Sequence, residues 1–202
     1  MNSSEWLCLW YLRLNGYFTL PNFIAHGRRD PLTEVDVLGI RLPHSTEFED
    51  DIKTLNIPPD RIDIVFAEAK RKEITDLNGP WGTPEKGALD YVLKRVGVVP
   101  AKDVATLATD LYAKRSSTTD SCDLRIVCFA ETAHEDLLKQ GVTFVPWTAV
   151  LAFIHARFAS NQRLKNDVSA WDEFGQYLWQ TLSGQAIPDV DAFFFNWERR
   201  GQ

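Results

Sequence analysis

The pattern of apolar and polar positions predicts a chain that opens with one helix and three strands. A helix starts near Glu5, capped by Ser3 or Ser4, and ends before the first strand. The strands are expected at residues 17–25, 33–42 and 62–70. A polar connection over 43–61, with room for a short helix, separates the second strand from the third.

The second half of the chain predicts helices that alternate with buried strands. The helices are expected at 84–96, 101–114, 147–164 and 169–182, and the strands at 123–130 and 142–146. Because the first three strands form a meander and a long helical connection precedes the fourth, a parallel crossover is allowed. The sequence therefore predicts an α/β fold with a mixed central sheet flanked by helices. We expect one domain over 1–202, with its core in about 1–146 and a helical, aromatic C-terminal extension over about 147–202.

The composition is that of a globular protein. The chain has 202 residues, of which 45% are hydrophobic and 25% charged. No apolar run approaches the roughly 20 residues that span a bilayer, and the start of the chain lacks the pattern of a signal peptide. We therefore expect a cytoplasmic protein without a membrane span.

The cysteines are few and scattered in apolar sequence. They are Cys8, Cys122 and Cys128, and this pattern favours reduced core thiols over disulfides.

Two acidic residues, Asp36 and Glu68, lie in strongly apolar strand segments. An acid in such a place is usually paired, hydrogen-bonded or bound to a cation. Side chains alternate along a strand, so Glu34 shares the face of Asp36 while Lys70 shares the face of Glu68. This pattern predicts a divalent-metal site. The alternative is a cross-strand salt-bridge ladder of Asp36, Glu68 and Lys70, with Glu34 in solvent and Glu5 only complementing the N-terminus of its helix.

The first 73 residues resemble the PD-(D/E)XK, or restriction-endonuclease-like, superfamily, especially the archaeal Holliday-junction resolvases and similar small bacterial proteins. The resemblance rests on an ordered set of motifs: Glu5, Leu12, Gly16-Tyr17, Asn22, Glu34-Val-Asp36 and Val65-Phe-Ala-Glu-Ala-Lys-Arg71. It implies a restriction-endonuclease-like fold in which Asp36 and Glu68 ligate a metal. It also implies that Lys70 orients or activates the attacking water, with Glu5 as a supporting acid on the first helix.

The activity that the resemblance implies is metal-dependent hydrolysis of DNA phosphodiesters, in repair, recombination or defence against foreign DNA. Two carboxylates and the Ala69 carbonyl, completed by water and phosphate, suit Mg²⁺ or Mn²⁺, and Glu34 is a further candidate ligand. The connection after Asp36 is longer and more acidic than in the compact resolvases, and no family motif follows Lys72. The alternative is a protein of the same fold with little or no catalysis, acting as a binding or assembly module.

Charge and aromatic content bear on the expected partners. The net charge of −6 argues against a broad basic surface for nucleic acid. A local phosphate-contacting rim is predicted from Arg28, Arg29, Arg41, Arg71 and Lys72, whereas the alternative treats them as solvated charges.

Apolar side chains in the C-terminal third recur at helical spacing and are expected in the core. They are Trp171, Phe174, Leu178 and Leu182. The aromatic segment 191–199 is harder to bury and is expected to dock on its own domain or on a partner, while a homodimer would fit the resemblance.

Overall fold

The central sheet begins with an antiparallel meander of β1 (Phe18–His26), β2 (Pro31–Arg41) and β3 (Ile62–Ala69). This computed structural model describes residues 1–26, 31–44, 55–58, 60–77, 81, 84, 87–160, 168–184 and 186–201. β6 (Cys122–Ala130) pairs in parallel with β3. β5 (Ser116–Thr118) and β8 (Thr143–Pro146) both pair with β6, the first antiparallel and the second parallel.

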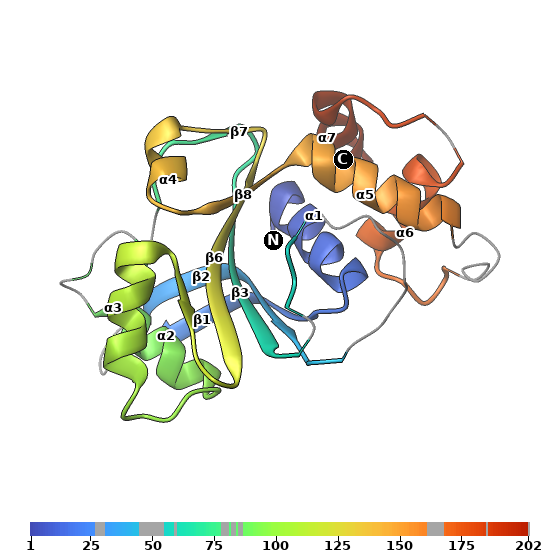
Figure 1. Cartoon of the computed structure of the whole chain (residues 1–202). Helices are drawn as coiled ribbons and strands as arrows, with labels where there is room; N and C mark the ends of the chain where they lie inside the picture. The colour runs from blue at the N-terminus through green and yellow to red at the C-terminus, as the bar shows by residue number, and fades with distance from the viewer. Residues whose placement is uncertain are drawn as a thin grey trace.

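Helices cover both faces of this sheet (Figure 1). One face carries α1 (Ser3–Leu14), α5 (Trp147–Ser160), α6 (Glu173–Leu182) and α7 (Val190–Glu198). The other face carries α2 (Ala88–Val96) and α3 (Val104–Lys114). Alternation along β3 supplies both cores, because Val65 and Ala67 face the first group of helices while Ile64 and Phe66 face the second.

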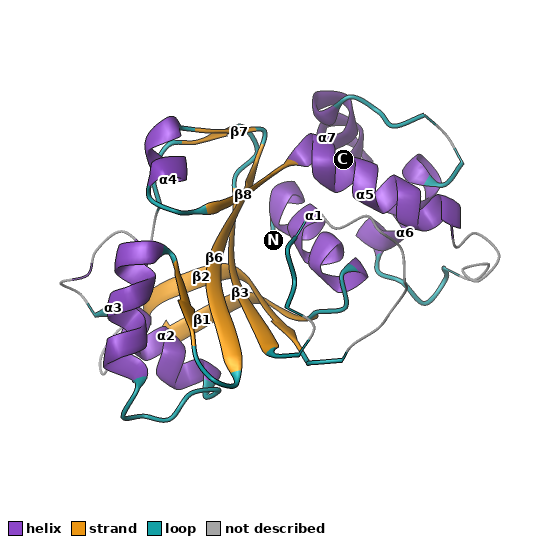
Figure 2. Cartoon of the chain, viewed as in Figure 1, coloured by secondary structure: helices purple, strands orange, loops and turns teal. Residues whose placement is uncertain are grey.

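Short elements complete the described fold, as Figure 2 shows by secondary structure. They are β4 (Glu73–Ile74), β7 (Thr132–Ala133), α4 (Glu135–Lys139) and the 3-10 turn η3 (Arg199–Gly201). β4 and β7 pair in parallel as a separate two-stranded sheet. No helix of the described residues is long and apolar enough to cross a membrane.

The predicted α/β arrangement, with a mixed sheet flanked by helices, is confirmed. The helix boundaries differ, however. α1 is capped by Asn2 rather than by Ser3 or Ser4, because Asn2 and Glu5 exchange hydrogen bonds in a capping box. α6 begins at Glu173, where the Asp172 carboxylate accepts a hydrogen bond from a backbone amide of the first turn. The predicted short helix over 43–61 falls largely outside the described residues.

The C-terminal aromatic segment is a helix that packs on its own chain. In α7, Phe193 and Phe194 are fully buried, while Phe195 is 53% exposed. A helix turns by about 100° per residue, so consecutive aromatic side chains cannot all face solvent. Tyr177 of α6 donates a hydrogen bond of 2.6 Å to the Phe193 carbonyl. The segment therefore docks on its own domain, one of the two expected alternatives, although Phe193 and Phe194 are buried more completely than the sequence predicts.

The three cysteines are free and buried, as predicted. Burial raises the pKa of the Cys8 thiol, and the negative charges of Asp36 and Glu5 raise it further. Burial also raises the pKa of Cys128, and the charge of Glu68 adds to this effect. Both thiols are therefore protonated at neutral pH and act as small apolar side chains.

Candidate active site

Asp36 lies where the ladder between β2 and β3 stops. The last paired residues are Val37 and Ala67, and the same register would place Asp36 opposite Glu68. At this point Asp36 Oδ2 accepts a hydrogen bond of 2.8 Å from the Ala69 amide. The carboxylate thus takes the place of a backbone acceptor and brings Asp36 to the peptide bond that follows Glu68.

The other side of β2 is irregular at the same residue. Pro21 pairs with Val37 and Phe23 with Val35, so Asn22 stands across from Asp36 without a paired partner in the register. Asn22 has φ of 48°, in the left-handed region that asparagine tolerates better than most residues. Val35 and Val37 pack into different cores although they are two residues apart. β2 therefore changes its facing at Asp36.

Glu68 is held inside the sheet beside Lys70. Its side chain is 4% exposed, and Glu68 Oε1 lies 3.4 Å from Lys70 Nζ, whose side chain is 38% exposed. In the parallel register Glu68 is the neighbour of Cys128. The ammonium group of Lys70 offsets part of the free-energy cost of burying the Glu68 carboxylate. The predicted proximity of Glu68 and Lys70 is thus present.

The chain leaving β3 is fixed by contacts that the sequence did not reveal. The Lys70 amide donates to the Phe129 carbonyl at 2.8 Å. Trp147 Nε1, at the start of α5, donates to the carbonyls of Lys70 and Arg71 at 2.9 and 3.1 Å. Trp147 is completely buried. These bonds hold the backbone after Glu68 in one position. The sequence gives no local sign of them, because the indole donor lies more than 70 residues further along the chain.

Glu5 and Glu34 lie within electrostatic range of Asp36. Glu5 Oε2 accepts a hydrogen bond of 3.0 Å from the Asn2 amide, so its carboxylate has a structural role in the capping box. Partial burial raises the pKa of Glu5, and the charges of Asp36 and Glu34 raise it further against the opposing Asn2 bond. Glu34 itself is exposed. Glu5, Glu34 and Asp36 therefore share one region of negative potential.

The donors around Asp36 fit a hard divalent cation in chemical type. Two carboxylates, Asp36 and Glu68, and the carbonyl of Ala69 are all oxygen donors, which Mg²⁺ and Mn²⁺ prefer. Within the described ranges, no group of three or more histidine, cysteine, aspartate or glutamate side chains is placed to hold a metal. Any cation bound here would thus depend on backbone, water and substrate oxygens as well as the two carboxylates.

Of the predicted basic rim, Arg41 does not lie beside these acids. Arg28 and Arg29 lie outside the described residues. Arg41 pairs in register with Asp63, which is five positions before Glu68 in β3 and therefore about 16 Å away along the strand. Arg41 thus lies at the opposite end of the ladder, because β2 runs antiparallel to β3 and its C-terminal residue meets the start of β3.

Arg71 and Lys72 are near the site, but carboxylates of the same chain engage them. Arg71 Nη1 lies 2.8 and 2.9 Å from the two carboxylate oxygens of Glu198. Lys72 Nζ lies 2.6 Å from Asp191 and 3.0 Å from Glu131. The hydrogen bonds that Lys72 donates to Asp191 and, to a smaller extent, to Glu131 raise the pKa of Lys72. Two of the five predicted phosphate contacts are thus ion-paired.

A buried polar network at the other end of β3 was also missed. Asp63 is fully buried, accepts a hydrogen bond from the Tyr17 hydroxyl and pairs with the Arg125 guanidinium. Arg125 Nη1 also donates to the Asn56 carbonyl at 3.1 Å. Burial raises the pKa of Tyr17, as does the Asp63 charge. The signal was available, because Asp63 is an acid inside the same apolar strand as Glu68.

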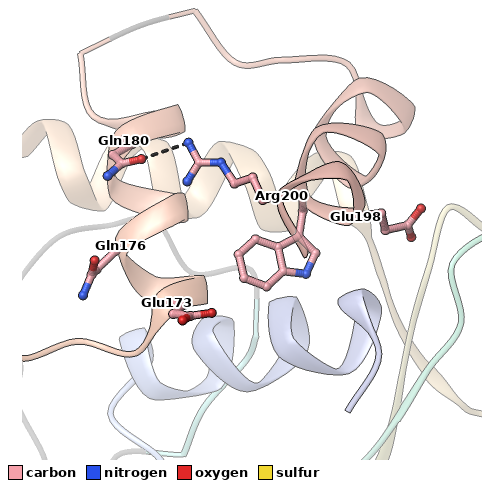
Figure 3. A pocket seen from close by; sticks show the side chains of 6 residues that line it. Glu173, Gln176, Gln180, Glu198 and Arg200 are labelled. Carbon is pink, nitrogen blue, oxygen red and sulfur yellow. Dashed lines mark hydrogen bonds between the residues drawn. The ribbon is translucent and has the colours of Figure 1, made fainter. Parts of the chain in front are cut away.

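A pocket of about 560 Å³ opens between α6 and α7 (Figure 3). It is lined by Glu173, Gln176, Gln180, Trp197, Glu198 and Arg200. Arg200 Nη2 donates to Gln180 Oε1 at 3.0 Å, and its guanidinium lies over the Tyr177 ring at 4.8 Å. None of the residues that the sequence singled out for chemistry lines this pocket.

Comparison with known proteins gives no relative for this chain. No family model, curated protein or solved structure matches it. Function is therefore inferred from the residues and their geometry.

Proposed function

We propose that this chain is a metal-dependent nuclease with a restriction-endonuclease-like fold that hydrolyses DNA phosphodiester bonds. One observation carries the proposal most directly. Asp36 is bonded to the amide that follows Glu68, and Glu68 is 3.4 Å from Lys70, so one carboxylate is bonded to the backbone next to a residue that forms a carboxylate–ammonium pair. The order of elements, a helix, an antiparallel meander and a parallel strand reached through helices, is compatible with that fold.

Each residue has a distinct part in the proposed reaction. A bound Mg²⁺ or Mn²⁺ would supply Lewis-acid activation of the phosphodiester. Asp36 and Glu68 would provide the negative oxygens that hold the cation, and the exposed Glu34 is a further candidate ligand. Lys70 stabilises the negative charge that develops at phosphorus and orients the attacking water. Glu5 increases the negative potential around Asp36.

A second candidate, a binding or assembly protein without catalysis, is supported by different observations. Glu68 is almost completely buried, which restricts the approach of substrate. Arg71 and Lys72 are engaged by acids, so the described surface beside the site offers phosphate less positive charge than the sequence suggests. A module of this kind would keep the ion pairs as structural contacts and recognise a partner without cleaving it.

The two candidates are separated by a cleavage assay with Asp36→Asn. The asparagine oxygen keeps an acceptor for the Ala69 amide but removes the charge that a cation requires. Wild-type protein is incubated with linear, branched and single-stranded DNA in Mg²⁺ or Mn²⁺. We expect cleavage by the wild type and a loss of at least about 100-fold in Asp36→Asn, the size seen when an electrostatic contribution to catalysis is removed.

Controls separate loss of charge from loss of fold. Asp123→Asn makes the same change in a β6 carboxylate that pairs with Arg61 at 3.6 Å, and it should leave cleavage intact. Lys70→Gln should reduce cleavage more than metal binding measured by calorimetry, because Lys70 acts on phosphate. Absence both of cleavage and of metal binding by the wild type would rule out the nuclease and leave the assembly candidate.

A further inference from the structure

The C-terminal helix places carboxylates on the basic residues next to the candidate active site. Glu198, at the end of α7, pairs with Arg71, and Asp191, in its first turn, pairs with Lys72. Arg71 and Lys72 directly follow Lys70 in the chain. Ser3 of α1 also donates a hydrogen bond to Glu198 at 3.1 Å, which orients that carboxylate.

These carboxylates occupy positions that phosphate oxygens would take. The two Glu198 oxygens accept from one guanidinium nitrogen, as phosphate oxygens can. The buried Arg71 Nε has no hydrogen-bond partner within the described part of the chain, so Glu198 does not satisfy the guanidinium completely. With Glu131, three carboxylates surround Arg71 and Lys72 and give the cluster one net negative charge.

The ion pairs can break and form with other partners while α7 stays packed on the domain. The side chains of Lys72 and Asp191 are 56% and 57% exposed, and those of Arg71 and Glu198 are 35% and 45% exposed, so salt screens both ion pairs. Phe193 and Phe194, by contrast, are fully buried, and Phe194 packs edge-on against Trp147. Figure 3 shows the Glu198 side chain extending away from the Gln180–Arg200 bond. Phosphate can therefore displace the carboxylates by side-chain motion alone.

We infer that Asp191 and Glu198 compete with nucleic-acid phosphate for Lys72 and Arg71 and so restrain binding at the proposed nuclease site. The inference rests on the proposed function, because it assigns a regulation to that site. Substrate phosphates that follow the reacting one must replace both carboxylates before they reach Arg71 and Lys72. A polyanion with closely spaced charges meets this requirement, whereas a single small anion replaces only one of them.

The test is the affinity of Asp191→Asn/Glu198→Gln for duplex and single-stranded DNA, measured by fluorescence anisotropy without divalent cations. Neutralising two acids changes the cluster from one net negative to one net positive charge. We expect tighter binding than the wild type. Raising the salt concentration from about 50 to about 200 mM weakens DNA binding. We expect this weakening to be about threefold greater for each additional phosphate that the variant contacts.

Matched variants assign the effect. Glu135→Gln/Glu173→Gln raises the net charge equally at acids that do not contact Arg71 or Lys72, and it should leave the affinity near that of the wild type. Adding Arg71→Met/Lys72→Met to the Asp191/Glu198 variant should abolish the increase in affinity. Thermal melting of each variant checks that the fold is retained.

The outcomes distinguish this inference from the nuclease proposal. Unchanged or weaker DNA binding by Asp191→Asn/Glu198→Gln, or an increase in affinity that persists without Arg71 and Lys72, overturns the competition. That result can coexist with cleavage that depends on Asp36. Conversely, an increase in affinity that requires Arg71 and Lys72, without cleavage or metal binding by any form, overturns the nuclease and supports the competition.

Discussion

Acids within the apolar strands are stabilised by different partners at each position. Asp36 accepts from a backbone amide, Glu68 lies beside Lys70, and Asp63 pairs with Arg125 and Tyr17. The cost of burying an acid was sufficient to single out Asp36 and Glu68 from sequence. It applied equally to Asp63, whose partners come from distant segments that no local pattern connects. An acid in an apolar strand thus marks a candidate site in one place and a structural ion pair in another.

Asp63 provides a prediction at this scale. Its side chain is fully buried and that of Arg125 is 12% exposed, so Asp63→Asn leaves a largely buried guanidinium without its counter-charge. We expect the free energy of unfolding to fall by about 3–5 kcal/mol. Urea unfolding measures it. The control Asp123→Asn, in the neighbouring strand, alters a more exposed pair with Arg61 and should cost less than about 1 kcal/mol. Equal losses would contradict the assignment.

Glu5 provides a second, pH-dependent prediction. Burial and neighbouring acids raise its pKa in the folded state, so the unfolded chain ionises first as pH rises above the ordinary value of 4.5. Stability is therefore lost with rising pH, and Glu5→Gln removes that loss while keeping a capping-box side chain. From about pH 4 to about pH 7, we expect the variant to gain less than about 1 kcal/mol relative to wild type, because Glu5 is only partly buried and solvent screens its interactions.

Chemical denaturation at a series of pH values measures this difference. Glu135→Gln, at an exposed acid of α4 that pairs with Lys139, serves as the control and should show no such trend. A stability difference between Glu5→Gln and wild type that is the same at every pH would contradict the raised pKa.

At the scale of elements, the contact between α1 and α6 depends on a glycine. A Cβ atom at Gly175 would lie 2.1 Å from Trp10 Cζ2. Trp10 Nε1 donates to Asp172 Oδ1 at 2.9 Å, and the same oxygen accepts from the Gly175 amide at 2.8 Å. The helix cap and the interhelical contact are thus joined through one carboxylate. The missing side chain lets α6 approach α1 closely.

Gly175→Ala should therefore destabilise the protein although alanine favours helices. We expect a net loss of about 1–3 kcal/mol from overpacking, measured by thermal or urea unfolding. In a Trp10→Leu background the clash is removed, and the same substitution should be neutral or stabilising. An equal loss in both backgrounds would show that the indole is not the cause.

At the scale of the whole molecule, the order of helices and strands was predictable from the sequence. The long-range ion pairs beside the candidate site were not. Local periodicity was enough for the helix, the meander and the parallel strand that place Asp36 and Glu68. The contacts of Arg71 join positions 127 residues apart, and those of Lys72 join positions 119 apart. A basic residue looks free in sequence because its partner is visible only after the chain has folded. For that reason Arg71 and Lys72 looked available to phosphate in the sequence, although α7 supplies a carboxylate to each of them.

The bond between Asp36 and Ala69 gives this site an internal reporter. The Ala69 amide proton is directed at a carboxylate, so its chemical shift and its exchange with solvent depend on the charge and position of Asp36. Anything that draws Asp36 Oδ2 toward a cation alters the protection of that single proton. The state of the proposed metal site is thus recorded in the backbone of β3, where nuclear magnetic resonance can observe it without any substrate.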